Sequence, residues 1–384
     1  DAVEKRSKLF IELYKKAIEE KLARGGEWES EELGAYMGVI DGYHIMAHYL
    51  FYTRDPIWEE MVKVYEDVGS YMVFVDFRLS QVDPTDLRGL PKLNSRDFVE
   101  WRPPMWLALL SKPDCHAILF LDEINLAPPL VQSSAYQLIY DRALGEVSLS
   151  PHVFIVGAGN RLEDRANVYE MAKPLQNRFV WAELKVPSVE EWVEWASNNG
   201  IDPRVMAFLS AKPNLLFKFD PRSKEPAFPT PRTWHYASDL IKGVEDLDLV
   251  EMLVASAVGS GAAIEFVAFL RLRHKLPKPE EVLRNPSIMR RYREEDVDVV
   301  LSLASALVEY VAPRFSKRPD DPKLCEAFLK MMDNTTPEVA MLMLKMTKAM
   351  IEERSLTRWV KSLVKSAGAS ATFGRLAKFI DVGG

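Results

Sequence analysis

The spacing of apolar residues divides the chain into three parts. In residues 1–24, side chains such as Leu9, Leu13 and Ala17 recur at helical spacing between charged positions, which predicts an amphipathic helix. Residues 31–68 continue this pattern, although the apolar and aromatic stretch at 43–52 fits a buried helix or a strand equally well. The pattern therefore predicts an N-terminal helical section over residues 1–69.

From residue 71 the helical spacing gives way to short runs of β-branched and aromatic residues, bounded by Gly, Pro, Asp or Asn. Four such runs are candidate strands, at residues 71–77, 117–121, 153–156 and 179–184. Helical segments separate them, at residues 99–110, 129–142 and 168–177. Strands that alternate with helices predict a parallel sheet covered on both faces, and therefore an α/β core over about residues 70–187.

The last part is helical from about residue 188 almost to the end of the chain, with long patterns at 233–274 and 295–383. The proline-rich residues 221–231 are typical of a linker. We therefore divide the chain into the N-terminal section at 1–69, a core region at 70–220 and a C-terminal all-helical part at 221–384.

The composition of the 384 residues, 48% hydrophobic and 27% charged, is that of a globular protein. The formal net charge of −7 argues against a general electrostatic contact with nucleic acid, which needs a basic face. The two cysteines, Cys115 and Cys325, lie far apart in the sequence, which favours a reducing compartment and a cytoplasmic location. Because no uninterrupted apolar run reaches about 18 residues, we expect no membrane span.

Two carboxylates follow directly after the most apolar candidate strand. Asp122 and Glu123 come at its carboxyl end, the edge at which open α/β sheets bind ligands. An Asp at this place can hold Mg²⁺ directly or through water, and an adjacent Glu can polarise a water for attack on a phosphate. The alternative is a core strand that ends in a solvated acidic turn.

Three further polar residues follow in an order that extends this chemistry. Asn160 ends the next candidate strand, where its amide can orient an attacking water. Arg178 precedes the fourth candidate strand, and Arg232 opens the C-terminal helical part. For each arginine the alternative is a surface salt bridge. Cys115 and His116 form a weaker candidate pair for nucleophilic chemistry, because neighbours on a strand point to opposite faces.

The order of these motifs resembles the MoxR-like group of AAA+ ATPases. The sequence reads LDEIN at 121–125, GAGN at 157–160, LQNRF at 175–179 and PTPRTW at 229–234. Similar stretches occur at 78–91 and 258–266, so that the resemblance covers roughly residues 70–280. It implies an AAA+ P-loop-type parallel sheet with a C-terminal all-helical lid, joined to the N-terminal helical section.

The resemblance also implies a role for each motif residue. Asp122 and Glu123 match the Walker B pair, for Mg²⁺ and for water activation, and Asn160 matches sensor 1. Arg178 matches the arginine finger that reaches the nucleotide of a neighbouring subunit, and Arg232 matches sensor 2, which contacts the nucleotide from the lid. The implied partners are other AAA+ subunits, in a homo- or hetero-hexameric ring, and a protein substrate or co-chaperone. Residues 83–94 and 144–150 would form surfaces that face the ring pore or a partner.

One element of that family is missing from the sequence. No Gly-x-x-x-x-Gly-Lys-Ser/Thr phosphate-binding loop occurs in the chain. In one explanation the loop is degenerate, with residues 43–52 as the preceding strand, 53–58 as the former loop and 59–68 as the following helix. In the other, residues 30–69 are one helical section and the segment that holds the loop is absent from this sequence.

These observations lead to two expectations of function. The first is an ATP hydrolase that uses ATP and Mg²⁺ to remodel or mature a partner protein within a ring. The alternative is a non-catalytic, AAA+-shaped scaffold or ring subunit with a defective nucleotide site. A nucleic-acid-associated AAA+ protein is a third reading, and the acidic charge balance counts against it.

Overall fold

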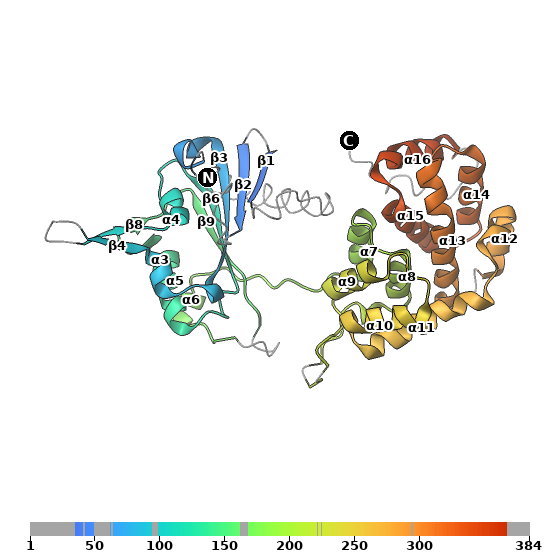
Figure 1. Cartoon of the computed structure of the whole chain (residues 1–384), viewed down its shortest axis with the longest axis horizontal. Coiled ribbons are helices and arrows are strands. Elements are labelled where there is room, and N and C mark those ends of the chain that lie inside the picture. Colours follow the sequence, from blue (N-terminus) through green and yellow to red (C-terminus); the bar gives the residue numbers. More distant parts are fainter. Residues whose placement is uncertain are drawn as a thin grey trace. The chain divides into compact units, whose positions relative to one another are not determined.

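The computed structural model describes the backbone of residues 35–40 and 43–49 and, more fully, residues 62, 64–93, 99–161, 168–220, 222–223, 225–292 and 295–366. The chain divides into two compact units (Figure 1). The described residues of the α/β unit lie within Glu27–Glu183, and those of the helical unit lie within Leu184–Gly384.

A five-stranded sheet organises the α/β unit, in the order β1-β2-β3-β6-β9. Strands β2, β3, β6 and β9 are parallel, whereas β1 is antiparallel to β2 at one edge of the sheet. The parallel β3-β6-β9 core confirms the predicted mixed α/β architecture, followed by a largely helical C-terminal region. The strand bounds are β1 Ala35–Ile40, β2 Tyr43–Tyr49, β3 Tyr71–Arg78, β6 His116–Asp122 and β9 Val153–Gly157.

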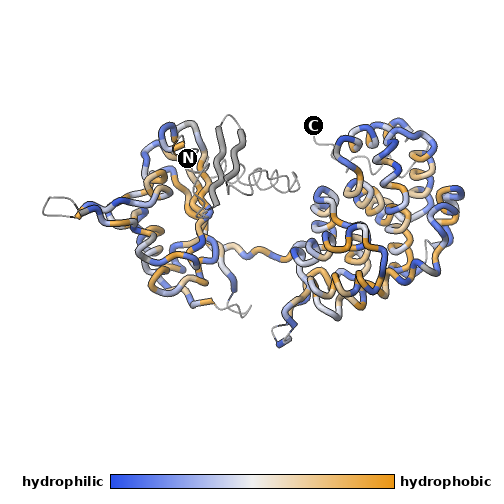
Figure 2. Tube along the Cα trace, viewed as in Figure 1, coloured by the Kyte–Doolittle hydropathy of each residue, from blue (hydrophilic) through white to orange (hydrophobic). Residues whose placement is uncertain are grey.

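The two faces of this sheet are covered differently by the described residues. On one face, Leu119 and Leu121 of β6 join a buried core with helices α4 (Met105–Leu110) and α5 (Pro129–Tyr140). The ring of Phe77 lies 4.8 Å from the ring of Trp106 in this core. On the other face Phe74 stacks on Phe120, and Phe154 of β9 remains 42% exposed. Figure 2 shows how hydrophobic β3, β6 and β9 of this sheet are.

Two β-hairpins project from the same unit. Helix α3 (Pro84–Arg88) leads into the hairpin β4 (Leu90–Leu93) and β5 (Val99–Arg102), and β7 (Ala143–Leu144) pairs with β8 (Val147–Ser148). The guanidinium of Arg88 lies 4.9 Å from the ring of Trp101 on β5, and its Nε would be 3.2 Å from a Cβ at Gly145. Arg88 therefore holds the two hairpins against each other.

Several sequence-based predictions for the α/β unit were wrong or only partly right. The continuous helix expected over residues 31–68 is interrupted by β1 and β2, although Val62 and residues 64–66 are helical as expected. The expected helix at 99–110 begins only at Met105, because its first residues form β5. The helix expected at 168–177 is reduced to α6 (Lys173–Gln176). The expected helix at 1–24 lies outside the described residues.

The fourth candidate strand, residues 179–184, does not form. This stretch is irregular, and Val180, Trp181 and Leu184 are 101%, 65% and 96% exposed. Its run of aromatic and β-branched residues fits a strand, but a strand is stable only when a neighbour satisfies its backbone groups. Among the described strands, β9 is the edge strand of the sheet, and it does not pair with residues 179–184.

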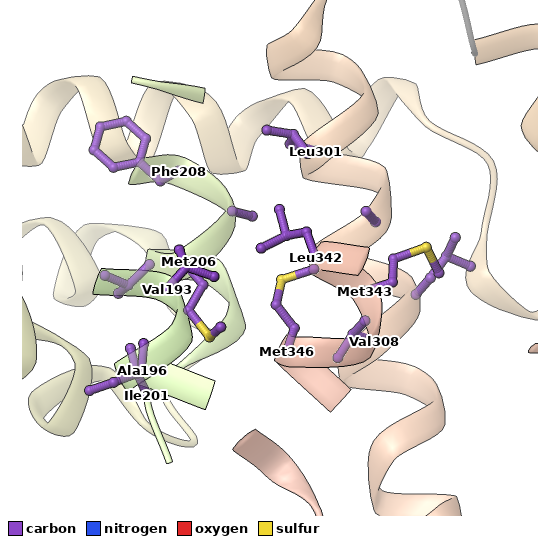
Figure 3. Packing of buried hydrophobic residues seen from close by; sticks show 14 of the residues in the cluster. Val193, Ala196, Ile201, Met206, Phe208, Leu301, Val308, Leu342, Met343 and Met346 are labelled. Atoms are coloured by element: carbon purple, nitrogen blue, oxygen red, sulfur yellow. The ribbon is translucent and has the colours of Figure 1, made fainter. Parts of the chain in front are cut away.

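The helical unit packs its helices around one hydrophobic core. Met206 of α8 faces Leu342 and Met346 of α15 (Figure 3). The ring of Phe208 points to the other side of α8, where it packs on Trp234 and Phe266. The helix bounds are α7 Val189–Asn198, α8 Pro203–Ala211, α9 Pro231–Ile241, α10 Leu247–Val258, α11 Ser260–Arg271, α12 Pro279–Arg284, α13 Val297–Lys317, α14 Pro322–Asp333, α15 Pro337–Met350 and α16 Glu353–Ser366.

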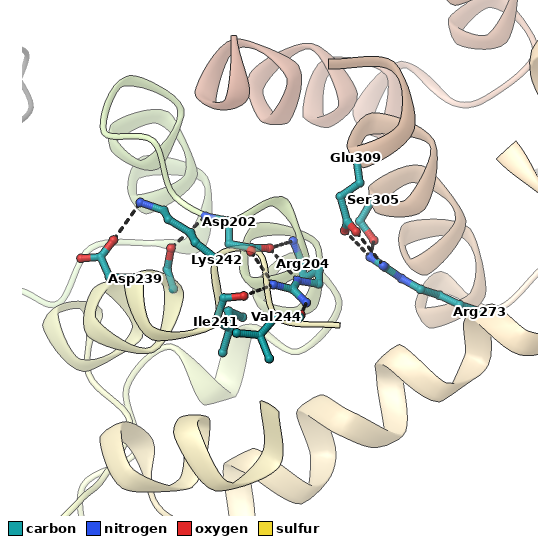
Figure 4. A network of polar contacts seen from close by, with 10 residues as sticks. Asp202, Arg204, Asp239, Ile241, Lys242, Val244, Arg273, Ser305 and Glu309 are labelled. Carbon is teal, nitrogen blue, oxygen red and sulfur yellow. Dashed lines mark hydrogen bonds and ion pairs between the residues drawn. The ribbon is translucent and has the colours of Figure 1, made fainter. Parts of the chain in front are cut away.

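A buried polar network fixes the start of α8 (Figure 4). The Arg204 guanidinium donates two hydrogen bonds to the Asp202 carboxylate, at 3.0 and 2.7 Å, and others to the carbonyls of Ile241 and Val244. Both charged residues are buried, so the pair is stable only because these partners satisfy it. The network therefore ties α8 to the turn between α9 and α10.

Helix α13 is long and apolar enough to cross a membrane by length and composition alone, the one such helix among the described residues. Its apolar positions are used inside the helical unit: Leu303, Leu307, Val311 and Phe315 are fully buried. It packs against α8 and α15, as the central helix of a protein core does.

We expect that Trp234→Ala destabilises the helical unit by about 3–5 kcal/mol, the usual effect of truncating a large buried aromatic residue. Trp234 is fully buried, its Nε1–H donates to the Leu215 carbonyl at 2.7 Å, and its ring packs near Phe208 and Phe266. Urea unfolding followed by far-UV circular dichroism measures the loss. Tyr236→Ala is the matched control on the same helix, since Tyr236 is 52% exposed. Equal losses in both variants would contradict the described core.

Candidate functional site

Asp122 and Asn160, two of the predicted site residues, lie with Arg78 at the carboxyl ends of three neighbouring parallel strands. Arg78 ends β3, Asp122 ends β6, and Asn160 follows β9 by three residues. Arg78 is directly opposite Asp122 in the strand register, and Leu121 is opposite Gly157. Parallel pairing therefore brings residues that are up to 82 positions apart (160 − 78) to one edge of the sheet.

Glu123 is held in an unusual backbone conformation at this edge. Its φ is 53°, in the left-handed region that non-glycine residues seldom adopt. Its amide donates to Asp122 Oδ1 at 2.9 Å, and its Oε2 accepts a hydrogen bond from Ser80 Oγ at 2.6 Å. Such strain costs on the order of 1–3 kcal/mol and persists where the surrounding structure imposes it, often at functional sites. The backbone conformation and the hydrogen bond from Ser80 therefore fix the direction of the Glu123 carboxylate.

Asp122 lies beside a positive charge. Its Oδ2 is 3.9 Å from Nε of Arg78, and both side chains are partly exposed. Water screens an ion pair of this kind, so that it adds little to stability. The carboxylate remains accessible from solvent, and a cation that binds Asp122 would have to compete with Arg78.

Asn125 positions the segment that ends in Asn160. The Asn125 side chain donates from Nδ2 to the Asn160 carbonyl at 2.6 Å and accepts from the Asn160 amide at 3.1 Å. A Cβ on Gly159 would lie only 2.5 Å from Asn125 Oδ1, so a glycine is needed for this close approach. Asn125 is buried whereas Asn160 is exposed. These two hydrogen bonds, which we call the Asn125 clamp, fix the backbone of Asn160 at the edge of the sheet.

The donors at this edge suit a magnesium ion that is shared with a phosphate ligand. Within the described ranges no group of three or more His, Cys, Asp or Glu residues is arranged to hold a metal by itself. Nucleotide-bound Mg²⁺ does not need such a cage, because phosphates and waters supply most of its oxygen ligands beside one or two carboxylates. The partly exposed pair Asp122 and Glu123 fits this donor set.

Arg178 lies just after α6, and it does not reach the acidic pair. Its guanidinium lies over the ring of Tyr140, 4.0 Å from the centroid. Tyr140 is the last residue of α5, whereas Glu123 precedes the first residue of that helix. None of the described contacts joins Arg178 to Asp122 or Glu123.

Arg232 belongs to the helical unit, in the first turn of α9. Thr230 and Thr233 form a capping box at this end, and Pro231 is the first helical residue. A cation in the first turn opposes the helix dipole, so helix stability does not account for an arginine here. Arg232 is exposed, as a residue that contacts a ligand would be.

Cys115, at the start of β6, is not a candidate nucleophile. The side chain is fully buried, and burial raises the pKa of its thiol to about 12. The neighbouring His116 stacks instead on His152, with ring centroids 4.4 Å apart. At neutral pH Cys115 is therefore a protonated thiol, which is a poor nucleophile.

Comparison with models of known protein families gave no match, and no curated protein or solved structure matched the chain.

Three contacts of the site were not predicted from the sequence: Ser80 with Glu123, Asn125 with Asn160, and Tyr140 with Arg178. Ser80 follows β3 at the same edge as the acidic pair, so its position was a usable signal. Asn125 lies within the LDEIN motif, two residues after Glu123. Nothing in the spacing of Tyr140 and Arg178 indicates that they meet.

We expect that Asn125→Ala increases the hydrogen-exchange rate of the Asn160 amide, because it removes the acceptor of that amide. It should also destabilise the α/β unit by about 1–3 kcal/mol, since the other backbone partner loses its bond as well. Asn125→Asp is the matched variant: it keeps an acceptor for the amide, and it replaces the donor to the carbonyl with an oxygen that the carbonyl repels. An Asn160 amide that exchanges equally fast in the wild type and in Asn125→Ala would argue against the clamp.

Both thiols should be protected in the native protein. Cys325 is buried like Cys115, and burial also raises the pKa of its thiol. A raised pKa keeps the unreactive protonated form up to higher pH, so at about pH 8 a disulfide reagent should react slowly with the folded chain. Unfolding in guanidinium should release two fast-reacting thiols. A fast stoichiometric reaction in the native state would contradict the burial of these residues.

Proposed function

We propose that this chain is a MoxR-like AAA+ subunit that uses ATP and Mg²⁺ to remodel or mature a partner protein. The observation that supports this most directly is the edge formed by Asp122, Glu123 and Asn160. Two carboxylates end one strand and a clamped asparagine follows the neighbouring parallel strand. This is the geometry expected of metal-assisted attack of water on a phosphate.

Each residue has a distinct task in that reaction. Asp122 would hold Mg²⁺, which supplies charge neutralisation at the phosphates when it is bound. Glu123 would accept a proton from the attacking water, a contribution of typically 10²–10⁴-fold in rate. Asn160 would orient that water. The Ser80 hydroxyl occupies one Glu123 oxygen at 2.6 Å, so it sets the direction of the carboxylate before water binds.

The sheet order bears on where the phosphates would be held. Strand β2 precedes the proposed degenerate loop at residues 53–58, which itself lies outside the described residues. β2 is three strand spacings from β9, about 14 Å at 4.8 Å per strand. A loop directly after β2 would therefore lie across β3 and β6 from Asn160, whereas the reaction needs the phosphate beside that residue. The other explanation is also wrong in part, because β1 and β2 interrupt the single helical section that it assumed over residues 30–69.

The proposed setting is a ring, hexameric by resemblance to the family, of identical or related AAA+ subunits. Arg178 lies at the far end of α5 from Glu123, which is consistent with a role at the nucleotide of a neighbour. Arg232 would contact the nucleotide from the helical lid. The hairpins joined by Arg88 are suited to contact a protein substrate or co-chaperone. We place this activity in the cytoplasm, without a membrane or nucleic-acid partner.

A non-catalytic scaffold is the second candidate function, and the absence of a phosphate-binding loop motif from the sequence favours it. Such a subunit would keep the shape of the ring and lend Arg178 to an active neighbour. It would have no use for the strained and hydrogen-bonded Glu123, which is why we rank it second.

Calorimetric titration of the chain with ATP and Mg²⁺ separates the two candidates. We expect binding, and turnover that Glu123→Gln abolishes while it leaves binding intact, because the amide cannot accept the proton. Glu66→Gln, at an exposed position of the same unit, is the control and should hydrolyse ATP at the wild-type rate. Absence of ATP binding would establish the scaffold instead. Binding with equal turnover in wild type and Glu123→Gln would contradict the assigned base.

A further inference from the structure

A small aromatic stack at the end of α5 supports the side chain of Arg178. Its guanidinium carbon lies 4.0 Å from the centroid of the Tyr140 ring. Tyr140 stacks in turn on Tyr136, one helical turn earlier, with ring centroids 5.6 Å apart and planes at 16°. Arg178 is exposed and Tyr140 is 50% exposed, so that this stack lies at the surface.

The stack is rigidly attached to the core of the α/β unit. Val131, Ala135 and Leu138 of α5 are buried in the hydrophobic core beneath the sheet. Tyr136 and Tyr140 are four residues apart and therefore share another face of the same helix. Leu175 is buried beside the α6 turn that carries Arg178. Both sides of the contact are thus held by packing, and little movement is left to the ring.

The contact leaves the arginine able to bind an anion. No carboxylate in the described part of the chain lies within ion-pair distance of Arg178. An aromatic face attracts the cation without using its N–H groups, whereas a carboxylate partner would occupy two of its five donors and cancel its charge. Tyr140 therefore restricts where the guanidinium lies, while the charge and the N–H donors of Arg178 remain able to bind an anion.

We propose that Tyr140 is a positioning residue, which holds Arg178 ready for a phosphate group bound to a second subunit. The guanidinium of Arg178 lies at the C-terminal end of α5, whereas Glu123 precedes the N-terminal end of that helix, and none of the described contacts joins Arg178 to the acidic pair of its own chain. The anion that Arg178 meets would therefore come from another molecule. This inference rests on the proposed function for the identity of the anion as a nucleotide phosphate, but the positioning by Tyr140 does not depend on it.

The first test is the chemical reactivity of Arg178 itself. Modification by p-hydroxyphenylglyoxal, followed by peptide mass mapping, gives a rate for each arginine in the folded chain. In Tyr140→Leu, which removes the aromatic face, Arg178 should react about two- to fivefold faster, the factor expected for an exposed cation–π contact. In Tyr140→Phe, which keeps the ring, the rate should stay that of the wild type. Arg102, whose side chain is 59% exposed, is the internal reference.

The second test uses ATP turnover in mixed assemblies. Glu123→Gln subunits retain Arg178, and Arg178→Ala subunits retain the acidic pair, so an equimolar mixture should regain part of the activity that each lacks alone. When the Glu123→Gln subunit also has Tyr140→Leu, the regained activity should fall severalfold, whereas Tyr140→Phe should preserve it. Tyr236→Leu, in the helical unit, is the control substitution.

The outcomes distinguish this inference from the proposed function. If the wild type does not hydrolyse ATP, the proposed function fails, and the modification rates still decide whether Tyr140 positions Arg178. If Arg178 reacts equally fast in the wild type and in Tyr140→Leu, the positioning role is wrong whatever the activity is. If reactivity changes but the Tyr140→Leu mixture regains full turnover, Tyr140 holds the arginine without a role in the reaction, and the proposal is overturned.

Discussion

The parallel pairing of β3, β6 and β9 is the constraint on which the candidate site depends. Because the three strands run in one direction, their carboxyl ends meet at one edge, and the register places Arg78 opposite Asp122. A shift of one residue would move Asp122 to the other face of the sheet. The apolar residues before it, Leu119 and Leu121, are fully buried and resist such a shift. The core therefore fixes the chemistry at its edge.

The sequence was sufficient to predict this part of the fold, because the three strands are short apolar runs whose burial determines their structure. Once the strands are assumed to be parallel, Asp122, Glu123 and Asn160 are expected at the same edge of the sheet. The finer contacts do not follow in this way. Ser80 reaches Glu123 through a left-handed turn, and Asn125 folds back onto Asn160, and no periodicity specifies either of them. At residues 43–49 the apolar pattern fitted helix and strand alike, and pairing with β3 decides for the strand.

Residues 179–184 show the limit of pattern reasoning most clearly. The aromatic and β-branched side chains of this run favour an extended backbone, but a strand also needs a partner for its backbone groups. In the structure Phe179 packs at the end of β9, where its ring would lie 3.3 Å from a Cβ at Gly157. The chain then leaves the sheet, and Val180 and Leu184 are almost completely exposed. Such exposure of large apolar side chains is unusual on the surface of a folded domain.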